Sequence, residues 1–178
     1  MLVKRAMSKN VVSVSVPGNR EKVLDLMRKE DKAVLPVVKG DTKQLVGLIT
    51  RSDLIVNPDE EQIAILMSTD LVTASPDDDV KDVAKKMIDN NVRRVPVVDD
   101  NGDLVGIITS FDLVSNALIK LESDDPVENF MITTVPTTWY KTPLNVAFET
   151  MKQFGLKSVL ALNDSAKLVG ILTETDFI

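Results

Sequence analysis

One eight-residue pattern occurs three times in this chain, and each copy has the form Gly-h-h-Thr-x-x-Asp-h, in which h is an apolar residue. The copies are GLITRSDL at Gly47–Leu54, GIITSFDL at Gly106–Leu113 and GILTETDF at Gly170–Phe177. A pattern of this length predicts a series of copies of one supersecondary unit. Any function of the unit is therefore expected at the paired side chains Thr50/Asp53, Thr109/Asp112 and Thr173/Asp176.

Other residues recur at similar distances and define the repeats. Met7 and Met67 are 60 residues apart, as are Pro36 and Pro96, and Met131 follows Met67 by 64. We predict three repeats, at residues 1–66, 67–126 and 127–178. The third stops directly after its aspartate, where the second continues with a helix, so we expect the sequence to be the N-terminal part of a longer chain.

The second repeat predicts the order of elements most plainly. Its elements are expected to be a strand at Leu71–Ala74, a helix, a strand at Val95–Val98, a hairpin turn at Asp99–Gly102, a strand at Leu104–Ile108 and a helix from Thr109 to Leu121. Ser75 is the expected N-cap of the first helix, with Pro76 at its first position. The predicted fold class is α/β (α+β), built from repeated β-α-β-β-α units.

Composition excludes several classes of function. The chain has no cysteine and no histidine, so the usual transition-metal ligands and the usual neutral-pH general base are missing. The absence of a phosphate-binding Walker loop adds to the prediction that the chain is not an enzyme. A net charge of −6 and only seven aromatic residues argue against nucleic-acid binding.

The same composition bears on location. Lack of cysteine fits a cytoplasmic protein, and the chain contains no stretch of 18 apolar residues that could span a membrane. The N-terminal residues lack the apolar segment that is typical of a signal peptide, so none is predicted.

The repeats resemble the CBS domain family. The resemblance rests on the openings Met7-Ser8, Met67-Ser68 and Met131-Ile132, on the strands Leu35–Val38 and Val95–Val98, and on the three Gly-h-h-Thr-x-x-Asp stretches. It implies that two complete repeats pack sheet against sheet as a pseudo-two-fold pair, and that the third is incomplete. It also implies that clefts between paired repeats bind AMP, ADP, ATP or S-adenosylmethionine, and that occupancy is passed to an attached or partner protein.

The Thr-x-x-Asp spacing has two interpretations, and the sequence leaves both open. It matches a capping box, in which the Thr accepts from a helix N–H and the acid reaches back to the Thr backbone. It also suits a nucleotide, because a helix N-terminus attracts phosphate and an ionised Asp accepts bonds from ribose hydroxyls.

Carried over from the family, three groups of side chains are expected at the sites. Ribose is assigned to Asp53, Asp112 and Asp176; phosphate to Thr50, Ser52, Thr109, Thr173, Thr175, Arg93 and Arg94; and adenine to Val12, Val72, Ile49 and Ile108. Alternatively the arginine pair balances nearby aspartates and the apolar residues are only core. The sequence does not decide whether the arginines serve the Asp53 or the Asp112 site. Pro136 at the adenine position of the third repeat makes the Asp176 site the least expected to fill.

These inferences favour a regulatory module that binds an adenine nucleotide and has no chemistry of its own. The rival function is a ligand-free assembly module, because an unpaired third repeat would expose an apolar face and form a homodimer. The regulated protein is not identified by the sequence.

Overall fold

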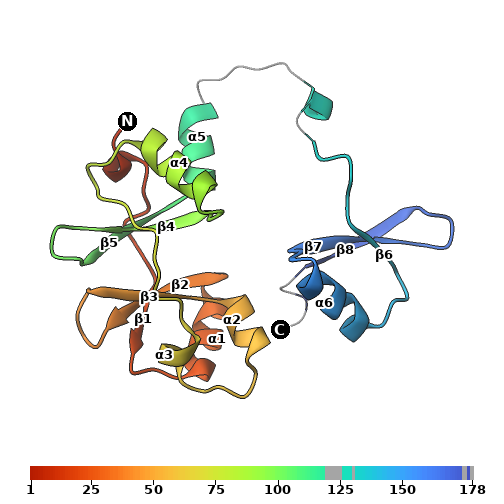
Figure 1. The fold of residues 1–178 in the computed structure, drawn as a ribbon, viewed down its shortest axis with the longest axis horizontal. Helices are drawn as coiled ribbons and strands as arrows, with labels where there is room; N and C mark the ends of the chain where they lie inside the picture. Colours follow the sequence, from red (N-terminus) through yellow and green to blue (C-terminus); the bar gives the residue numbers. More distant parts are fainter. Residues whose placement is uncertain (119–125, 130, 174–175, 177–178) are drawn as a thin grey trace. The chain divides into compact units, whose positions relative to one another are not determined.

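The computed structural model describes residues 1–118, 126–129, 131–173 and 176 of the chain. They belong to two compact units, Met1–Glu122 and Ser123–Ile178. The first unit contains the first two repeats and the second contains the third repeat (Figure 1).

The first repeat has the predicted order of elements. They are β1 (Val14–Val16), α1 (Arg20–Lys29), β2 (Val34–Lys39), β3 (Leu45–Thr50) and α2 (Arg51–Val56). In the sheet, β2 lies between β1, which is parallel to it, and β3, which is antiparallel. Helix α1 begins where the Asn19 side chain accepts from the Lys22 N–H, and it buries Val23 and Met27, one helical turn apart, against the sheet.

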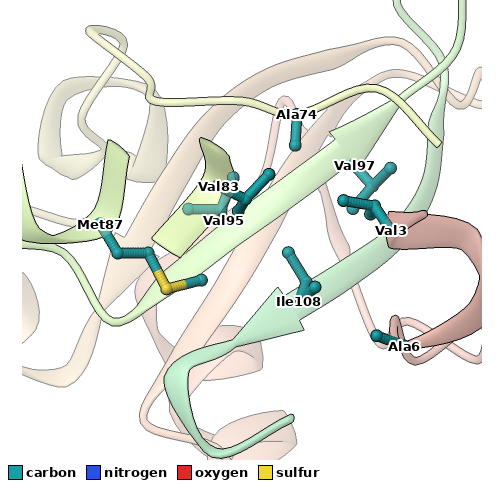
Figure 2. Close-up of a cluster of buried hydrophobic side chains, with 8 residues drawn as sticks. All are labelled: Val3, Ala6, Ala74, Val83, Met87, Val95, Val97 and Ile108. Carbon is teal, nitrogen blue, oxygen red and sulfur yellow. The ribbon is translucent and has the colours of Figure 1, made fainter. Parts of the chain in front are cut away.

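The second repeat has the same arrangement, but its sheet contains two strands instead of three. Its elements are α4 (Val80–Asp89), β4 (Arg94–Val98), β5 (Leu104–Thr109) and α5 (Ser110–Leu118), and β4 pairs antiparallel with β5. Residues 119–121 of the predicted last helix lie outside the described residues. Val83 and Met87 of α4 and Val95 of β4 meet Ile108 of β5 in the core (Figure 2).

The predicted strand at Leu71–Ala74 is wrong. Only Ala74 pairs with β4, through a single parallel bridge to Val97. Pro76 occupies the position that Val16 has in β1, and a proline has no N–H to continue the pairing. The strand therefore stops before it becomes regular.

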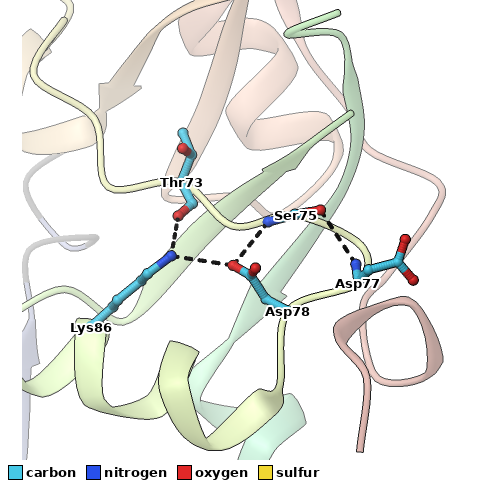
Figure 3. Close-up of polar contacts among 5 residues, drawn as sticks. All are labelled: Thr73, Ser75, Asp77, Asp78 and Lys86. Carbon is cyan, nitrogen blue, oxygen red and sulfur yellow. Dashed lines mark hydrogen bonds and ion pairs between the residues drawn. The ribbon is translucent and has the colours of Figure 1, made fainter. Parts of the chain in front are cut away.

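The predicted start of the following helix is also wrong. Ser75 does not cap a helix; its N–H donates to Oδ2 of Asp78 at 3.1 Å (Figure 3). The Asp78 N–H donates to the Ser75 carbonyl, also at 3.1 Å. This turn delays the helix by four residues, so that Asp79 becomes the N-cap and accepts from the Lys81 N–H.

Each of the first two repeats has its core completed by the other. We call the residues that precede the opening methionine of a repeat its leader. The leader of the first repeat contains η1 (Val3–Arg5), and that of the second contains α3 (Ile63–Leu66). Val3 is buried in the core of the second repeat, and Ile63 is buried in the core of the first.

Backbone hydrogen bonds hold both leaders in place. The Val3 N–H donates to the Asp78 carbonyl at 3.0 Å, and the Ile63 N–H donates to the Gly18 carbonyl at 3.3 Å. The exchange explains why the first two repeats form one compact unit, and it confirms the predicted fold of paired α/β repeats.

The exchange continues at the opening methionines. Met7 packs on Gly106 of β5, and Met67 packs on Gly47 of β3. The next residues pair with the same strands: Ser8 exchanges two backbone hydrogen bonds with Ile107, of 2.9 and 3.0 Å, and Ser68 does the same with Leu48, at 2.9 and 3.0 Å.

The third repeat forms a small unit of its own. Its elements are η2 (Val127–Asn129), β6 (Thr137–Trp139), α6 (Leu144–Gln153), β7 (Ser158–Leu162) and β8 (Leu168–Thr173), with the strand order β6-β7-β8. Ala147, Met151 and Val159 are buried. Strand β8 differs from β3 and β5, because its first four residues, including Gly170, are exposed.

No helix among the described residues has both the length and the apolar character needed to cross a lipid bilayer.

Candidate functional site

A capping box forms at the Thr-x-x-Asp motifs of the first two repeats. In the second repeat, the Thr109 N–H and hydroxyl both donate to Oδ2 of Asp112, at 2.8 and 2.6 Å, and the Asp112 N–H donates back to the Thr109 hydroxyl at 3.1 Å. Thr50 and Asp53 make the same three bonds at 2.8, 2.8 and 3.2 Å. The capping interpretation of the motif is therefore confirmed.

The bonds leave the ligand interpretation open. At both sites the two bonds to the carboxylate fall on one oxygen, Oδ2. The bonds from the threonine do not use Oδ1, so the cap itself does not exclude a ligand hydroxyl at the aspartate. Capping and ribose binding are thus compatible roles of one aspartate.

The third repeat has the same two bonds to its aspartate. The Thr173 N–H and hydroxyl donate to Oδ2 of Asp176, at 2.7 and 2.9 Å. The backbone bond from Thr173, and then the bond from its hydroxyl, lower the pKa of Asp176. Thr175 lies outside the described residues. Pro136 uses its carbonyl to accept from the Leu160 N–H at 3.0 Å and has no N–H to offer a base.

A cleft of about 270 Å³ lies at the Thr109/Asp112 box, within the first unit. This volume is close to the lower end of ligand pockets in proteins, roughly 300–1,000 Å³. Both repeats contribute to it. The second repeat supplies Arg94, Ile107, Thr109 and Asp112, and the first supplies Ser8, Asn10–Val12 and Asp31–Pro36.

Four of the residues expected to bind a nucleotide meet in this cleft. Thr109 and Asp112 lie at the start of α5, Arg94 at the start of β4, and Val12 in the segment before β1. Arg93 is exposed and is not part of the lining. The structure therefore places one arginine of the pair, Arg94, on the Asp112 side.

The other expected residues lie elsewhere. Ile49 and Ile108 are completely buried in the two cores. Val72 packs partly buried against the core of the second repeat, and Ser52 is half-buried in α2. Thr50 and Asp53 lie at the start of α2, outside the lining of this cleft.

Strand alternation explains why Ile107, rather than Ile108, lines the cleft. Successive side chains of a strand point to opposite faces, so the residue two before Thr109 shares its face and the residue directly before it does not. In β5, Gly106 and Ile108 are buried whereas Ile107 is half-buried. The alternation was available in the sequence and would have identified Ile107.

The charged lining of the cleft is balanced. Lys32 and Arg94 bring positive charge, and Asp31 and Asp112 bring negative charge. Asp31 has a φ of +48° in the turn after α1. Asp31 and Asn10 were not identified from the sequence, because neither belongs to a repeated motif and only the fold brings their loops to the cleft.

The acidic run Asp77–Asp79 is satisfied by cations and by the backbone. Asp77 contacts Lys4 at 2.6 Å, Asp78 contacts Lys86 at 3.2 Å, and Asp79 contacts the N-terminal amine at 2.9 Å. The Ser75 N–H, more than Lys86, lowers the pKa of Asp78. Within the described part of the chain, no three acidic side chains are placed to share a metal ion.

Comparison with known proteins agrees with this architecture. The chain matches the CBS domain over residues 3–58, 61–118 and 127–178. The chain belongs to the CBS domain family. One curated relative, the uncharacterized protein MJ1426 of Methanocaldococcus jannaschii, is 32% identical to the chain over 64% of the chain and 89% of the relative.

Two solved structures share the CBS fold. Protein MJ1225 of Methanocaldococcus jannaschii is 22% identical over 99% of this chain and 71% of its own, with a TM-score of 0.89. The CBS domain pair of protein MJ0100, solved with 5′-methylthioadenosine and S-adenosyl-L-methionine, is 32% identical over 65% of this chain and 98% of its own, with a TM-score of 0.60. The chain spans less than half the length of several other curated relatives.

Proposed function

We propose that the chain is a cytoplasmic regulatory module that binds AMP, ADP or ATP in the cleft between its first two CBS repeats and catalyses no reaction. The observation that carries this proposal is the meeting of Asp112, Thr109 and Arg94 of one repeat with Val12 of the other in that cleft. These side chains offer one partner for each part of a nucleotide.

Asp112 is the proposed ribose ligand. An ionised carboxylate only accepts hydrogen bonds, and a diol only needs acceptors for its two hydroxyl protons. Such charge-assisted bonds contribute about 1.5–3 kcal/mol each. The capping bonds to Oδ2 hold the carboxylate in place before the ligand arrives.

The phosphate groups are proposed to bind Arg94 and Lys32, the two cations of the cleft. The Thr109 hydroxyl already donates to Asp112, so it would have to turn away to donate to a phosphate oxygen. Arg94 and Lys32 line the same cleft and need no such change. An arginine also presents a planar fork that matches two phosphate oxygens. The start of α5 adds the positive end of a helix dipole.

Adenine is expected beside the apolar side chains of Val12 and Ile107, which lie on the two repeats. An adenosine ligand is supported by the MJ0100 pair, which carries 5′-methylthioadenosine and S-adenosyl-L-methionine and is 32% identical to this chain. S-adenosylmethionine remains the alternative ligand. Its sulfonium is positively charged, so Lys32 and Arg94 favour a phosphate in its place.

Regulation follows from the position of the cleft between two repeats. A ligand that contacts both stabilises the arrangement in which they are paired, by an amount that grows with ligand concentration relative to Kd. A regulated protein that binds this arrangement better than others would sense the nucleotide.

Equilibrium dialysis against AMP, ADP, ATP, S-adenosylmethionine and GTP tests the proposal. We expect at least one adenine nucleotide to bind more tightly than about 1 mM, and GTP to bind more weakly. Asp112→Asn should weaken that binding more than the matched variant Asp53→Asn. Absence of binding by all five compounds would contradict the proposal. Mass spectrometry of small molecules released from the purified protein would identify the ligand.

The second candidate function is ligand-free assembly. The observation that favours it is the exposure of Leu168, Val169 and Ile171 on β8, because the corresponding residues of β3 and β5 are half-buried.

A further inference from the structure

A second cleft lies beside the proposed nucleotide site, within the first unit, and has a volume of about 290 Å³. Its lining comes from residues 9–11 and 13, from Val38, Thr42 and Lys43 of the β2–β3 hairpin, and from Leu104 of β5. The two clefts share Asn10 and Val11 but none of their charged side chains. The second cleft is therefore a separate candidate site.

The charged lining of this cleft is entirely positive. Lys9 and Lys43 supply the charge, and no aspartate or glutamate contributes among the residues that the structure describes. Within the same part of the chain, neither ammonium group takes part in an ion pair. The chain carries a net charge of −6, yet none of its described acids is placed to neutralise these two lysines.

Apolar side chains lie behind the two lysines. Val38 is buried, and Val11 and Leu104 are half-buried. A cleft that has charge of one sign and apolar walls focuses the electric field and raises the local concentration of ions of the opposite sign. Asn10 and Ser13 add an amide and a hydroxyl that can donate hydrogen bonds. The lining therefore suits an anion with several oxygen atoms.

The backbone that carries each lysine is already held in place. The Leu104 N–H donates to the Lys43 carbonyl at 2.8 Å. The Thr42 hydroxyl donates to the Lys39 carbonyl at 2.6 Å, which closes the turn before Lys43. Ser8, directly before Lys9, exchanges two backbone hydrogen bonds with Ile107, of 2.9 and 3.0 Å. A ligand therefore needs to order only the two lysine side chains, which lowers the cost of binding.

The two lysines are not required by the repeated fold. Gly102 follows Lys43 by 59 residues, the same spacing that relates Gly47 to Gly106, and Thr69 follows Lys9 by 60. The backbone bonds of the two hairpins are symmetric, because the Leu45 N–H donates to the Gly102 carbonyl as the Leu104 N–H donates to Lys43. The second repeat thus keeps the backbone arrangement without either cation.

We infer that this cleft binds a small oxyanion that carries several negative charges, of the phosphate or pyrophosphate type, separately from the nucleotide. An ammonium group is a compact charge with three donors, which suits phosphate oxygens, and an anion with several charges attracts both lysines at once. None of the charged groups assigned to the nucleotide is used, so the inference holds or fails independently of the proposed function.

Calorimetric titration of the full chain with inorganic pyrophosphate, at low ionic strength and without divalent metal, tests the site. We expect the wild type to bind more tightly than about 1 mM. Lys9→Gln and Lys43→Gln should each weaken the binding by about fivefold or more, the effect of one close charge in water.

The matched control is Lys39→Gln. This variant removes the same charge from the same hairpin, but Lys39 is not part of the lining. We expect it to bind pyrophosphate like the wild type. A wild type that does not bind, or equal losses in Lys39→Gln and Lys43→Gln, would overturn the inference. Loss of binding in Arg94→Gln with none in the two lysine variants would place the anion in the nucleotide cleft and would also overturn it.

The phosphate chain of a nucleotide in the neighbouring cleft offers the same oxygens, and ATP separates this source from a free anion. For a separate site, Lys43→Gln should weaken pyrophosphate and leave the ratio of ATP to AMP affinity unchanged. A variant that loses ATP but retains pyrophosphate would assign Lys43 to the nucleotide and contradict the inference.

Chemical labelling gives a readout that needs no variant. Lys9, Lys39 and Lys43 are all exposed, so an acetylating reagent should modify all three in the absence of a ligand. Pyrophosphate should slow the labelling of Lys9 and Lys43 by about threefold or more at about 70% occupancy, and should leave Lys39 unchanged. Mass spectrometry of peptides measures each rate. Equal protection of all three lysines, or of none, would contradict a site at this cleft.

Discussion

Met7 of the first repeat lies so close to Gly106 of the second that a Cβ on the glycine would be 2.5 Å from the methionine sulfur. Met67 has the same relation to Gly47, where the backbone carbonyl of Ser68 is also only 3.1 Å from the Cβ position. Neither glycine has a positive φ. The glycine of the repeated motif is therefore required by the close approach of the opposite repeat, and not by the local backbone.

Replacing these two glycines with alanine is expected to lower the stability of the fold by different amounts. Gly47→Ala should lower the free energy of unfolding by about 1–3 kcal/mol, because a backbone carbonyl cannot move as easily as a side chain. Gly106→Ala should cost less, since only the flexible Met7 side chain must shift. Urea denaturation followed by circular dichroism measures the difference.

Gly170→Ala is the control for this series. The added methyl group meets nothing, so the variant should be as stable as the wild type or slightly more stable. Equal losses at Gly47 and Gly170 would contradict the packing argument.

The capping box of the second repeat predicts a second stability effect. Thr109→Ala removes the hydroxyl that accepts from the Asp112 N–H and should cost about 0.5–2 kcal/mol. Thr109→Ser keeps the hydroxyl and should cost clearly less. Thermal unfolding measures both variants. Equal unfolding temperatures for Thr109→Ala and Thr109→Ser would contradict a capping role of the hydroxyl.

Asp78 predicts a dependence of stability on pH. The Ser75 N–H and Lys86 lower its pKa in the folded state below the ordinary value of 3.8. A lowered pKa means that the ionised group stabilises the fold at pH values above 3.8, and that this contribution is lost as the pH falls through the folded pKa.

Asp78→Asn is therefore expected to cost about 1 kcal/mol at pH 7, at the low end for a charged hydrogen bond because the carboxylate is partly exposed. The difference from the wild type should shrink as the pH is lowered past 3.8. Denaturation at a series of pH values measures it. A difference that is constant from pH 7 to pH 2.5 would be inconsistent with this account.

The sequence predicted the features that depend on near neighbours. Thr109 and Asp112 are three residues apart, so their capping bonds are set by one helical turn. The β4–β5 hairpin likewise follows from Val95–Val98, from the turn at Gly102, which has a φ of +80°, and from the returning strand. Local interactions decide both features, because the interacting residues lie close together in the sequence.

Predictions failed where a distant contact or a competing turn decided the outcome. The turn of Ser75 with Asp78 replaced the expected cap, and Pro76 ended the expected strand. The exchange of Val3 and Ile63 joins positions on different repeats, and no local pattern signals which repeat a leader covers. The loop that carries Asp31 and Lys32 lies at the cleft through packing between repeats, which no local pattern signals either.

The two adjacent arginines are predicted to differ in function. Arg94 lines the cleft and Arg93 does not, so Arg94→Gln should weaken ADP or ATP by about tenfold while adenosine binding changes little. Arg93→Gln is the matched control and should bind all three compounds nearly as the wild type does. Calorimetric titration measures these affinities, and equal losses of ATP and adenosine in Arg94→Gln would indicate damage to the fold instead of a phosphate contact.

The most direct test of the nucleotide site is a cycle that compares AMP with 2′-deoxy-AMP in the wild type and in Asp112→Asn, by calorimetric titration. An asparagine can still accept from the Thr109 N–H, so the ratio of the two affinities isolates the bond between carboxylate and hydroxyl. We expect the wild type to prefer AMP by about tenfold or more, and the variant to lose most of that preference. Equal binding of the two nucleotides by the wild type would contradict the assignment of Asp112 to ribose.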